Sequence, residues 1–359
     1  MIRSVIPDVI RSVIPQVIPR VILRLSAAGI VLACGGAPAS PPAAPPAPEG
    51  GRPSYGALSE TGLYSDLASQ TLAAGVRAFA PNFILWADGA DKQRWLQLPE
   101  GAQIDSSDMN RWSFPVGTRA WKQFSLGGVP LETRLVERYG PAPDDYWMGA
   151  FVWQEDGSDA SFVAEGQLDL QGTPHDAPAQ DKCPACHNGE PGRLLGFSAL
   201  QLSRAEDAAQ ASPEADAWTL ARLAEEQRLS APPAAGSHYA PPGDTTSAAA
   251  LGYLHANCGH CHNPRGTSWP DTQMVLRLDV DSSSLEDTRL FRSVVGQALQ
   301  YYRADPGTLR VVPGDPAASA LVQRMQVRGP KEQMPPLATE EIDSEGLDIV
   351  RRWIANLPD

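Results

Sequence analysis

The chain has 359 residues, of which 42% are hydrophobic, and its formal net charge at pH 7 is −13. This apolar content is sufficient for a packed core, and the length allows one large domain or two ordinary ones. The negative charge argues against nucleic acid as a partner, because phosphate binding requires clustered lysine and arginine. The sequence also has neither a glycine-rich dinucleotide fingerprint nor a nucleophile elbow, which argues against the enzyme classes that use them.

Residues 1–33 have the layout of a secretory signal peptide of the lipoprotein type. Arg20 and Arg24 precede an uncharged run, residues 25–33, that is too short to span a bilayer. The run ends at Cys34, and this end resembles the lipobox of bacterial lipoproteins, whose cysteine becomes the lipidated first residue. Leu32 is larger than the usual residue at its place, and a free Cys34 thiol after ordinary cleavage is the alternative. We therefore expect an exported protein, anchored by lipid on the periplasmic side of a bacterial membrane or at the cell surface.

Residues 34–56 are rich in proline and alanine. A segment of this composition cannot bury enough apolar surface to offset the entropy lost on ordering, and its prolines keep the chain extended. We expect a disordered tether between the lipid anchor and the folded part of the chain.

Residues 57–180 are predicted to form an antiparallel β domain. Segments of alternating polarity, separated by turn signals, lie at residues 94–98, 119–124, 131–136 and 146–153. A period of two between turn signals is typical of antiparallel strands. Six of the nine tryptophans fall in this domain, and we expect them in its core rather than at a cofactor: Trp86, Trp95, Trp112, Trp121, Trp147 and Trp153.

Two copies of the pattern Cys-x-x-Cys-His follow, made of Cys183, Cys186 and His187 in the first copy and of Cys258, Cys261 and His262 in the second. The pattern is the attachment signature of a c-type haem, in which both cysteine sulfurs form thioethers and the histidine ligates iron. A zinc site is the alternative, but paired zinc knuckles usually lie closer together and need no histidine directly after the second cysteine. We predict two covalently bound haem c groups.

Two proline pairs, at residues 232–233 and 241–242, divide the region after residue 180. Residues 181–243 are then a first haem-binding helical segment, with an amphipathic helix over 213–228. Residues 244–359 are a second haem domain. Its predicted helices run over 247–258, into the second motif, and over 340–357, where apolar residues recur at three- and four-residue steps.

A methionine near the C-terminus is the candidate sixth ligand of the second iron. Met334 lies between the predicted helices in a loop that Pro335 and Pro336 stiffen. Haem iron in an electron carrier usually has histidine on one side and a thioether on the other, which raises its potential. We therefore expect His262 and Met334 to hold the second iron, with core packing as the alternative role of Met334.

The second haem domain resembles a class I cytochrome c domain. The resemblance rests on the helix before Cys258, the motif up to His262, the Met334 loop and a terminal helix with Trp353. A longer pattern resembles an uncharacterised family of exported dihaem c-type cytochromes and includes residues 85–92, 114–118, 132–135 and 253–258. This resemblance implies haem binding and electron transfer, without an established substrate. The expected fold class is α+β, with an N-terminal antiparallel β domain followed by a mainly α-helical cytochrome c-type haem region.

The first haem has no obvious methionine ligand, since none occurs between Met148 and Met274. His175, eight residues before Cys183, is the first choice, because a nearby loop histidine can fold back across a porphyrin. The alternatives are His238, Met148 and a vacant sixth position.

We therefore expect a protein that transfers single electrons in the bacterial cell envelope, with redox proteins there as its partners. The first alternative is a peroxidase-like or other redox enzyme that uses an open site at the first haem, because open iron can bind peroxide. The short spacing between the two motifs favours the carrier over the enzyme. A module in which haem only stabilises the fold is a third alternative.

Overall fold

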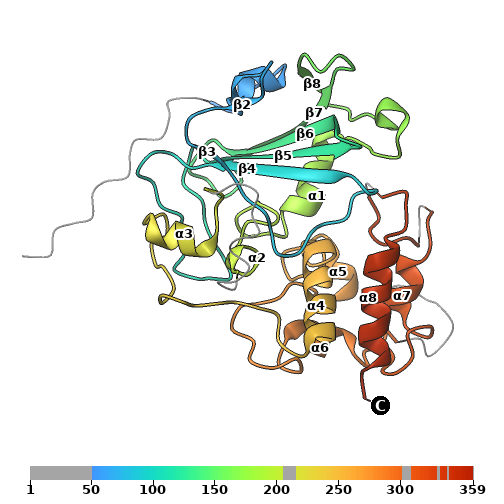
Figure 1. Ribbon diagram of the computed structural model, residues 1–359. Helices are drawn as coiled ribbons and strands as arrows, with labels where there is room; N and C mark the ends of the chain where they lie inside the picture. The colour runs from blue at the N-terminus through green and yellow to red at the C-terminus, as the bar shows by residue number, and fades with distance from the viewer. Residues whose placement is uncertain (1–50, 205–215, 301–308, 330–331, 338, 359) are drawn as a thin grey trace, which may run out of the picture. The chain divides into compact units, whose positions relative to one another are not determined.

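The computed structural model describes residues 51–359 except 205–215, 301–308, 330–331, 338 and 359 (Figure 1). The expected signal peptide, Cys34 and most of the expected tether lie outside these residues. The chain is already packed at Tyr55, whose ring meets Trp147 edge-on with 5.0 Å between centroids and whose hydroxyl donates to Glu137 at 2.5 Å. The folded part of the described chain therefore includes Tyr55, two residues before the predicted start of the β domain.

The first part of the described chain forms an antiparallel sheet whose six strands are paired in sequence order (Figure 1). They are β3 (Val76–Ala78), β4 (Asp91–Gln97), β5 (Arg119–Leu126), β6 (Val129–Arg138), β7 (Tyr146–Trp153) and β8 (Ala160–Phe162). A separate antiparallel pair consists of β1 (Tyr64–Asp66) and β2 (Thr71–Leu72). The four predicted strands are confirmed as β4 to β7. The other four were not predicted, because strands of two or three residues are too short to show alternation.

The two faces of the six-stranded sheet contribute to separate apolar cores. On one face, four of the six tryptophans pack together with Leu135 and Phe151, namely Trp95, Trp121, Trp147 and Trp153. On the other face, Leu96, Val136 and Met148 pack against residues that follow the sheet in sequence. Trp112 belongs to this second core. Trp86 belongs to none of the described cores, so the prediction of a core role is wrong for this tryptophan alone.

The described helices are mostly short. Three 3-10 turns are η1 (Leu58–Thr61), η2 (Leu170–Gly172) and η3 (Gln180–Lys182), and the α-helices are α1 (Cys183–His187), α2 (Ala199–Leu202), α3 (Leu220–Glu225), α4 (Thr245–Asn257), α5 (Trp269–Thr272), α6 (Arg289–Val294), α7 (Ala320–Met325) and α8 (Ser344–Ala355). The α+β class is confirmed. The expectation of a mainly helical region after residue 180 is not met, because most described residues there lie outside helices. Frequent proline and glycine explain the difference, since both residues interrupt helices.

Two of the three predicted helices are confirmed. The helix expected at 247–258 is α4, whose first turn is capped when Ser247 N donates to Asp244 Oδ1 at 2.7 Å. The helix expected at 340–357 is α8, capped in the same way by Asp343. The helix expected at 213–228 is reduced to α3 among the described residues. Trp218 instead lies alongside β3, where its backbone N–H donates to the Ala78 carbonyl at 2.8 Å.

The helices after α3 share one apolar core, to which α4 and α8 contribute Leu251, Leu254, Leu347 and Val350. A Cβ added at Gly346 would lie 2.1 Å from the Tyr253 ring, so the two helices cross closely there. Among the described residues, no helix combines the length and the apolar character that crossing a bilayer requires.

The tryptophan core gives a direct stability prediction. Trp121 is 1% exposed, and its Nε1 donates to Thr61 Oγ1 at 3.1 Å. We expect Trp121→Ala to lower the free energy of unfolding by about 3–5 kcal/mol, because it leaves a large cavity. Urea unfolding followed by circular dichroism measures this loss, with Leu168→Ala as a control at a side chain that is 71% exposed. Equal effects of the two substitutions would contradict this assignment of the core.

Candidate functional site

The first Cys-x-x-Cys-His motif forms α1, directly after η3. His187 Nδ1 lies 2.6 Å from the Arg193 carbonyl oxygen. A carbonyl oxygen only accepts, so Nδ1 carries the proton and Nε2 keeps its lone pair for a metal. Burial lowers the pKa of His187 to about 4, which keeps the imidazole neutral at pH 7.

The second motif follows the last turn of α4, with Cys258 as the residue that caps the helix. The chain continues in a helical turn, because His262 N donates to the Cys258 carbonyl at 2.9 Å. The His262 side chain is 6% exposed, and Thr272 Oγ1 lies 3.4 Å from its Nδ1. Burial lowers the pKa of His262 to about 4, so this imidazole is also neutral at pH 7. Nε2 is the ring nitrogen left for a metal.

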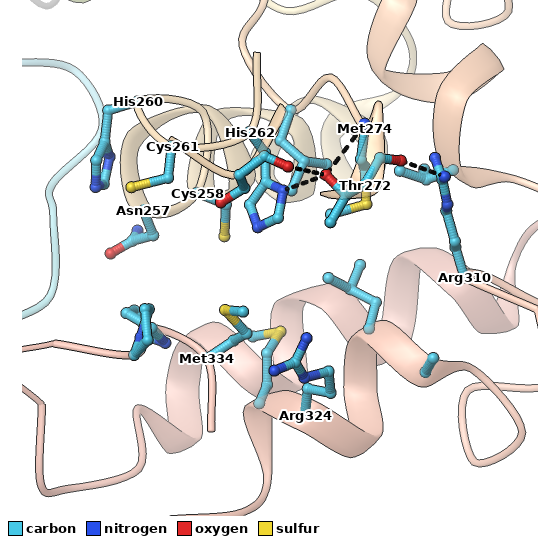
Figure 2. Close-up of a pocket in the computed structure, with 18 of the residues that line it drawn as sticks. Asn257, Cys258, His260, Cys261, His262, Thr272, Met274, Arg310, Arg324 and Met334 are labelled. Carbon is cyan, nitrogen blue, oxygen red and sulfur yellow. Dashed lines mark hydrogen bonds between the residues drawn. The ribbon is translucent and has the colours of Figure 1, made fainter. Parts of the chain in front are cut away.

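The second motif lines a cavity of about 1360 Å³, part of which is open to solvent. Figure 2 shows Cys258 and His262 on one wall and the Met334 side chain across the open space from them. Most of the exposed lining is apolar, including Leu276, Val294 and Leu321. The structure thus brings the predicted iron ligands His262 and Met334 to one cavity.

Hydrogen bonds hold the loop that carries Met334. The Met334 N–H donates to the Arg324 carbonyl of α7 at 3.0 Å. The Pro335 carbonyl accepts from Thr339 Oγ1 at 3.1 Å and from Gln333 Nε2 at 3.2 Å. These bonds fix the backbone on both sides of the thioether, so that Met334 is oriented by its loop.

The first motif lines another cavity, of about 1180 Å³ and also partly open to solvent. It is termed the first cavity, after its motif, and the cavity of the second motif is termed the second cavity. Its walls include Cys183, Cys186 and His187 from α1 and the inner face of the sheet. Neither His175 nor the two alternatives, His238 and Met148, line this cavity.

His175 is committed elsewhere in the described structure. It is 2% exposed, its Nε2 lies 2.9 Å from Glu132 Oε2, and its ring lies 4.8 Å from the Phe124 ring centroid. The structure therefore does not bring His175 to the cavity of the first motif. The sequence suggested His175 because it is near Cys183 along the chain, whereas the loop after η2 places its ring against Glu132 of β6.

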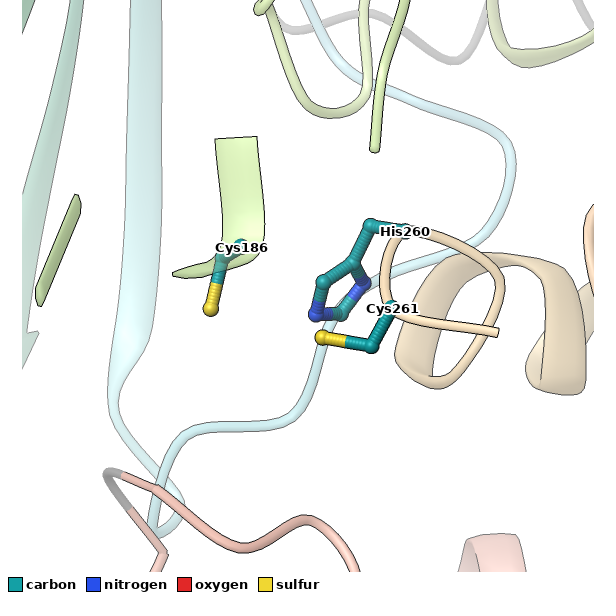
Figure 3. Close-up of side chains that lie close together, drawn as sticks. All are labelled: Cys186, His260 and Cys261. Atoms are coloured by element: carbon teal, nitrogen blue, oxygen red, sulfur yellow. The ribbon is translucent and has the colours of Figure 1, made fainter. Parts of the chain in front are cut away.

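The two motifs touch each other. A Cβ added at Gly189, just after the first motif, would lie 1.8 Å from the His260 carbonyl oxygen of the second. Cys186 Sγ, Cys261 Sγ and a ring nitrogen of His260 all lie within 4.8 Å of one another. Figure 3 shows the three side chains from α1 and from the turn after α4 converging on one point. The sequence motifs, 75 residues apart, are thus neighbours in space.

The two cavities share a wall formed by Trp86, Cys186, Asn257, His260, Pro335 and Leu337. Asn257 fixes this wall, since its Oδ1 accepts from Trp86 N at 2.7 Å and its Nδ2 donates to the Ile84 carbonyl at 3.1 Å. Trp86 Nε1 and His260 Nδ1 are buried there without a hydrogen-bond partner among the described residues. A buried donor without a partner costs free energy, so both atoms suit a bound polar group in the cavities. Sequence analysis missed this role of Trp86, although its place in a loop between strands was a signal.

Basic side chains line the inner face of the sheet beside the first cavity. Burial lowers the pKa of Arg94 to about 10 and holds the pKa of Lys122 well below its ordinary value. Repulsion from the neighbouring Arg134 lowers the pKa of Lys122 further. This electrostatic feature was not predicted from the sequence.

No protein-family model matches the sequence, and no curated protein or solved structure matches it significantly. The residues and the geometry of the two cavities therefore remain as the indications of function.

Proposed function

We propose that the protein is a dihaem c-type cytochrome that transfers single electrons in the bacterial cell envelope. The observation that carries the proposal is the lining of the second cavity. There the two cysteines of the second motif and His262 lie across an apolar space from Met334. Cys258 and Cys261 would attach one haem, with His262 and Met334 as the ligands of its iron. Cys183, Cys186 and His187 would hold the other. Haem supplies a reversible one-electron couple when bound.

The residues around both cavities fit such a group. Each histidine has its Nδ1 engaged with an oxygen, which leaves Nε2 as the nitrogen for a metal, and no hydrogen bond to Nε2 is found among the described residues. Each cavity is mostly apolar and partly open to solvent, and Trp86 offers an N–H at the shared wall that has no partner among the described residues. Apolar walls exclude water and thereby raise the effect of nearby charges on the potential.

Contact between the motifs suits electron transfer from one centre to the other. Thr267 Oγ1 donates to the Ala185 carbonyl at 3.2 Å, which ties the second motif's loop to α1. Arg277 donates to both carboxylate oxygens of Glu190, at 3.0 and 3.2 Å, beside the same contact. A rigid junction keeps the two attachment sites at a constant separation, and a constant separation favours a constant rate of transfer between them.

We further propose that residues 244–359 form a class I cytochrome c-type unit. The crossing of α4 and α8, the motif after α4 and the Met334 loop support this assignment. We propose export with lipid attached at Cys34, and redox proteins of the envelope as partners. The layout of residues 1–34 supports export and lipid attachment.

A zinc site at the motif contact is a weaker interpretation. Cys186, His260 and Cys261 could together ligate zinc, because two thiolates and an imidazole are ordinary zinc ligands. Such a site would leave Cys258, His262 and Met334 without a role, although all three line one cavity.

The test of the carrier function is electron exchange with a soluble cytochrome. We expect the fully reduced protein, mixed with an oxidised soluble cytochrome c in a stopped-flow spectrometer, to lose the reduced bands of both haems. The partner should gain the same number of electrons. Retention of both reduced haems with every soluble partner would instead favour a module in which haem only stabilises the fold.

A second candidate function is conversion of a small ligand at the first haem. The observation that favours it is the lining of the first cavity, in which the described residues include no methionine and only one histidine besides His187, namely His260. Peroxide-dependent oxidation of a reduced donor over many turnovers would support this enzyme. A single oxidation per haem would leave the carrier as the function.

A further inference from the structure

Three cations lie side by side on the sheet face that lines the first cavity. Arg94 on β4 is the register partner of Lys122 on β5, and Lys122 is the partner of Arg134 on β6. Residues paired across strands point to the same face of a sheet, and all three line the cavity beside Cys183 and Cys186. Arg94, Lys122 and Arg134 are termed the cation row.

The negative charge within the sheet does not balance the cation row. Like charges directly opposite each other on neighbouring strands are destabilising. Arg134 donates to both oxygens of Glu132, at 2.7 and 2.8 Å, and Glu132 also bonds His175. Arg94 is 6% exposed, and among the described residues its guanidinium donates one hydrogen bond, to the Lys92 carbonyl at 3.4 Å. Among the same residues, the Lys122 ammonium contacts only the Phe124 ring, 4.8 Å from its centroid.

Other charged groups near this face do not supply the missing charge. Glu190 lines a smaller neighbouring cavity with Arg94 and Lys122, but both its oxygens accept from Arg277. Lys92 adds a further cation beside the row, at the amino end of β4. The row therefore presents excess positive charge to a cavity with space in front of it.

We propose that the cation row binds a carboxylate or a small oxyanion in the first cavity. Guanidinium groups present paired N–H donors that match two oxygens, and the ammonium between them adds a point charge. Two sources have this chemistry. One is the propionate carboxylates of a haem attached at Cys183 and Cys186, and the other is a free oxyanion that enters the same space. The first source rests on the proposed function, and the second does not.

Substitutions that remove one charge and keep the length of the side chain test the proposal. Lys122→Met and Arg94→Met are compared with Arg111→Met, a control whose side chain is 60% exposed and lines neither cavity that the row borders. Lys122→Arg keeps the charge and should behave as the unaltered protein. Lys122→Gln replaces Lys122→Met if the latter does not fold. Each purified holoprotein is titrated calorimetrically with sodium nitrite and with sodium phosphate, and its haems are titrated redox-potentiometrically.

If the ligand is a free oxyanion, nitrite or phosphate binds the unaltered protein and the Arg111→Met control equally. The dissociation constant then rises at least tenfold in Lys122→Met and Arg94→Met. If the ligand is haem propionate, neither anion binds, and loss of one cation favours the oxidised form of one haem. A tenfold change in that redox equilibrium corresponds to a fall of about 59 mV in its midpoint potential. Either outcome supports the proposal and identifies the source.

Absence of anion binding, together with unchanged midpoint potentials in both methionine variants, would overturn the proposal. In that case the unfolding temperature should rise in Lys122→Met, because removing the central charge relieves repulsion that nothing compensates. A protein without haem would overturn the proposed function alone, because nitrite and phosphate titration would still test the cation row.

Discussion

Replacing Met334 with leucine should remove the long-wavelength sulfur-to-iron absorption band of the oxidised protein. Leucine has nearly the same volume, so the loop and the cavity should remain folded while the sulfur is lost. The midpoint potential of one haem should fall by on the order of 100 mV, a modest part of the ~0.8 V range that axial ligands span. Optical spectroscopy of the oxidised protein and a redox titration measure the two effects.

Met274 and Met325 provide matched controls, because both also line the second cavity. Met274→Leu and Met325→Leu should keep the band and both midpoint potentials. If the band persists in Met334→Leu and disappears in one of these variants, the sixth ligand has been assigned to the wrong methionine. If no variant changes the spectrum, none of these three methionines ligates iron.

The double substitution Cys258→Ser with Cys261→Ser should reduce covalently bound haem from two groups per chain to one. Both thioether sulfurs of the second motif are then absent, whereas those on α1 are untouched. The sulfur-to-iron band should disappear as well, because Met334 serves only the second iron. A pyridine haemochrome assay of the purified, denatured protein measures the haem count.

The matching substitution at the first motif separates the two sites. Cys183→Ser with Cys186→Ser should also leave one haem per chain, but with the sulfur-to-iron band intact. Loss of the band in the first-motif variant would show that Met334 belongs to the other haem.

Cys34→Ser should keep both haems and move the protein from the membrane fraction to the soluble fraction.

Much of the fold could be predicted because its signals are local. Alternation along 94–98 and 146–153 predicts β4 and β7, and apolar spacing after residue 340 predicts α8. The candidate ligands His262 and Met334, which line one cavity, could be singled out because both residues carry chemical signatures that do not depend on the fold. The short α3 could not be predicted, because the contact of Trp218 with β3 outweighs local helix propensity.

Features that depend on pairing between distant segments were not predictable. The cation row exists only in the register that sets Arg94 beside Lys122 and Arg134. The contact between Gly189 and His260 joins loops that nothing in the sequence links. The place of His175 was not predictable for the same reason, since its partner Glu132 lies 43 residues away on β6.

A shared wall between two cavities distinguishes this arrangement from a single cytochrome c unit. Asn257 and Trp86 connect the cavities through a hydrogen bond of 2.7 Å, and the Met334 loop reaches the same wall through Pro335. Under the proposed function, electrons would enter at one haem and leave at the other across this wall. The cation row lines the first cavity, whereas Arg310, Arg324 and Arg328 line the second, so the two haems would have different charged surroundings and should have unequal potentials.

The haem content of the purified full-length protein, produced with export and haem attachment intact, tests the central claim most directly. Pyridine haemochrome absorbance, divided by protein concentration from amino-acid analysis, should give two haems per chain, both resistant to acid–acetone extraction. A value of zero, or haem that extracts completely, would contradict the account.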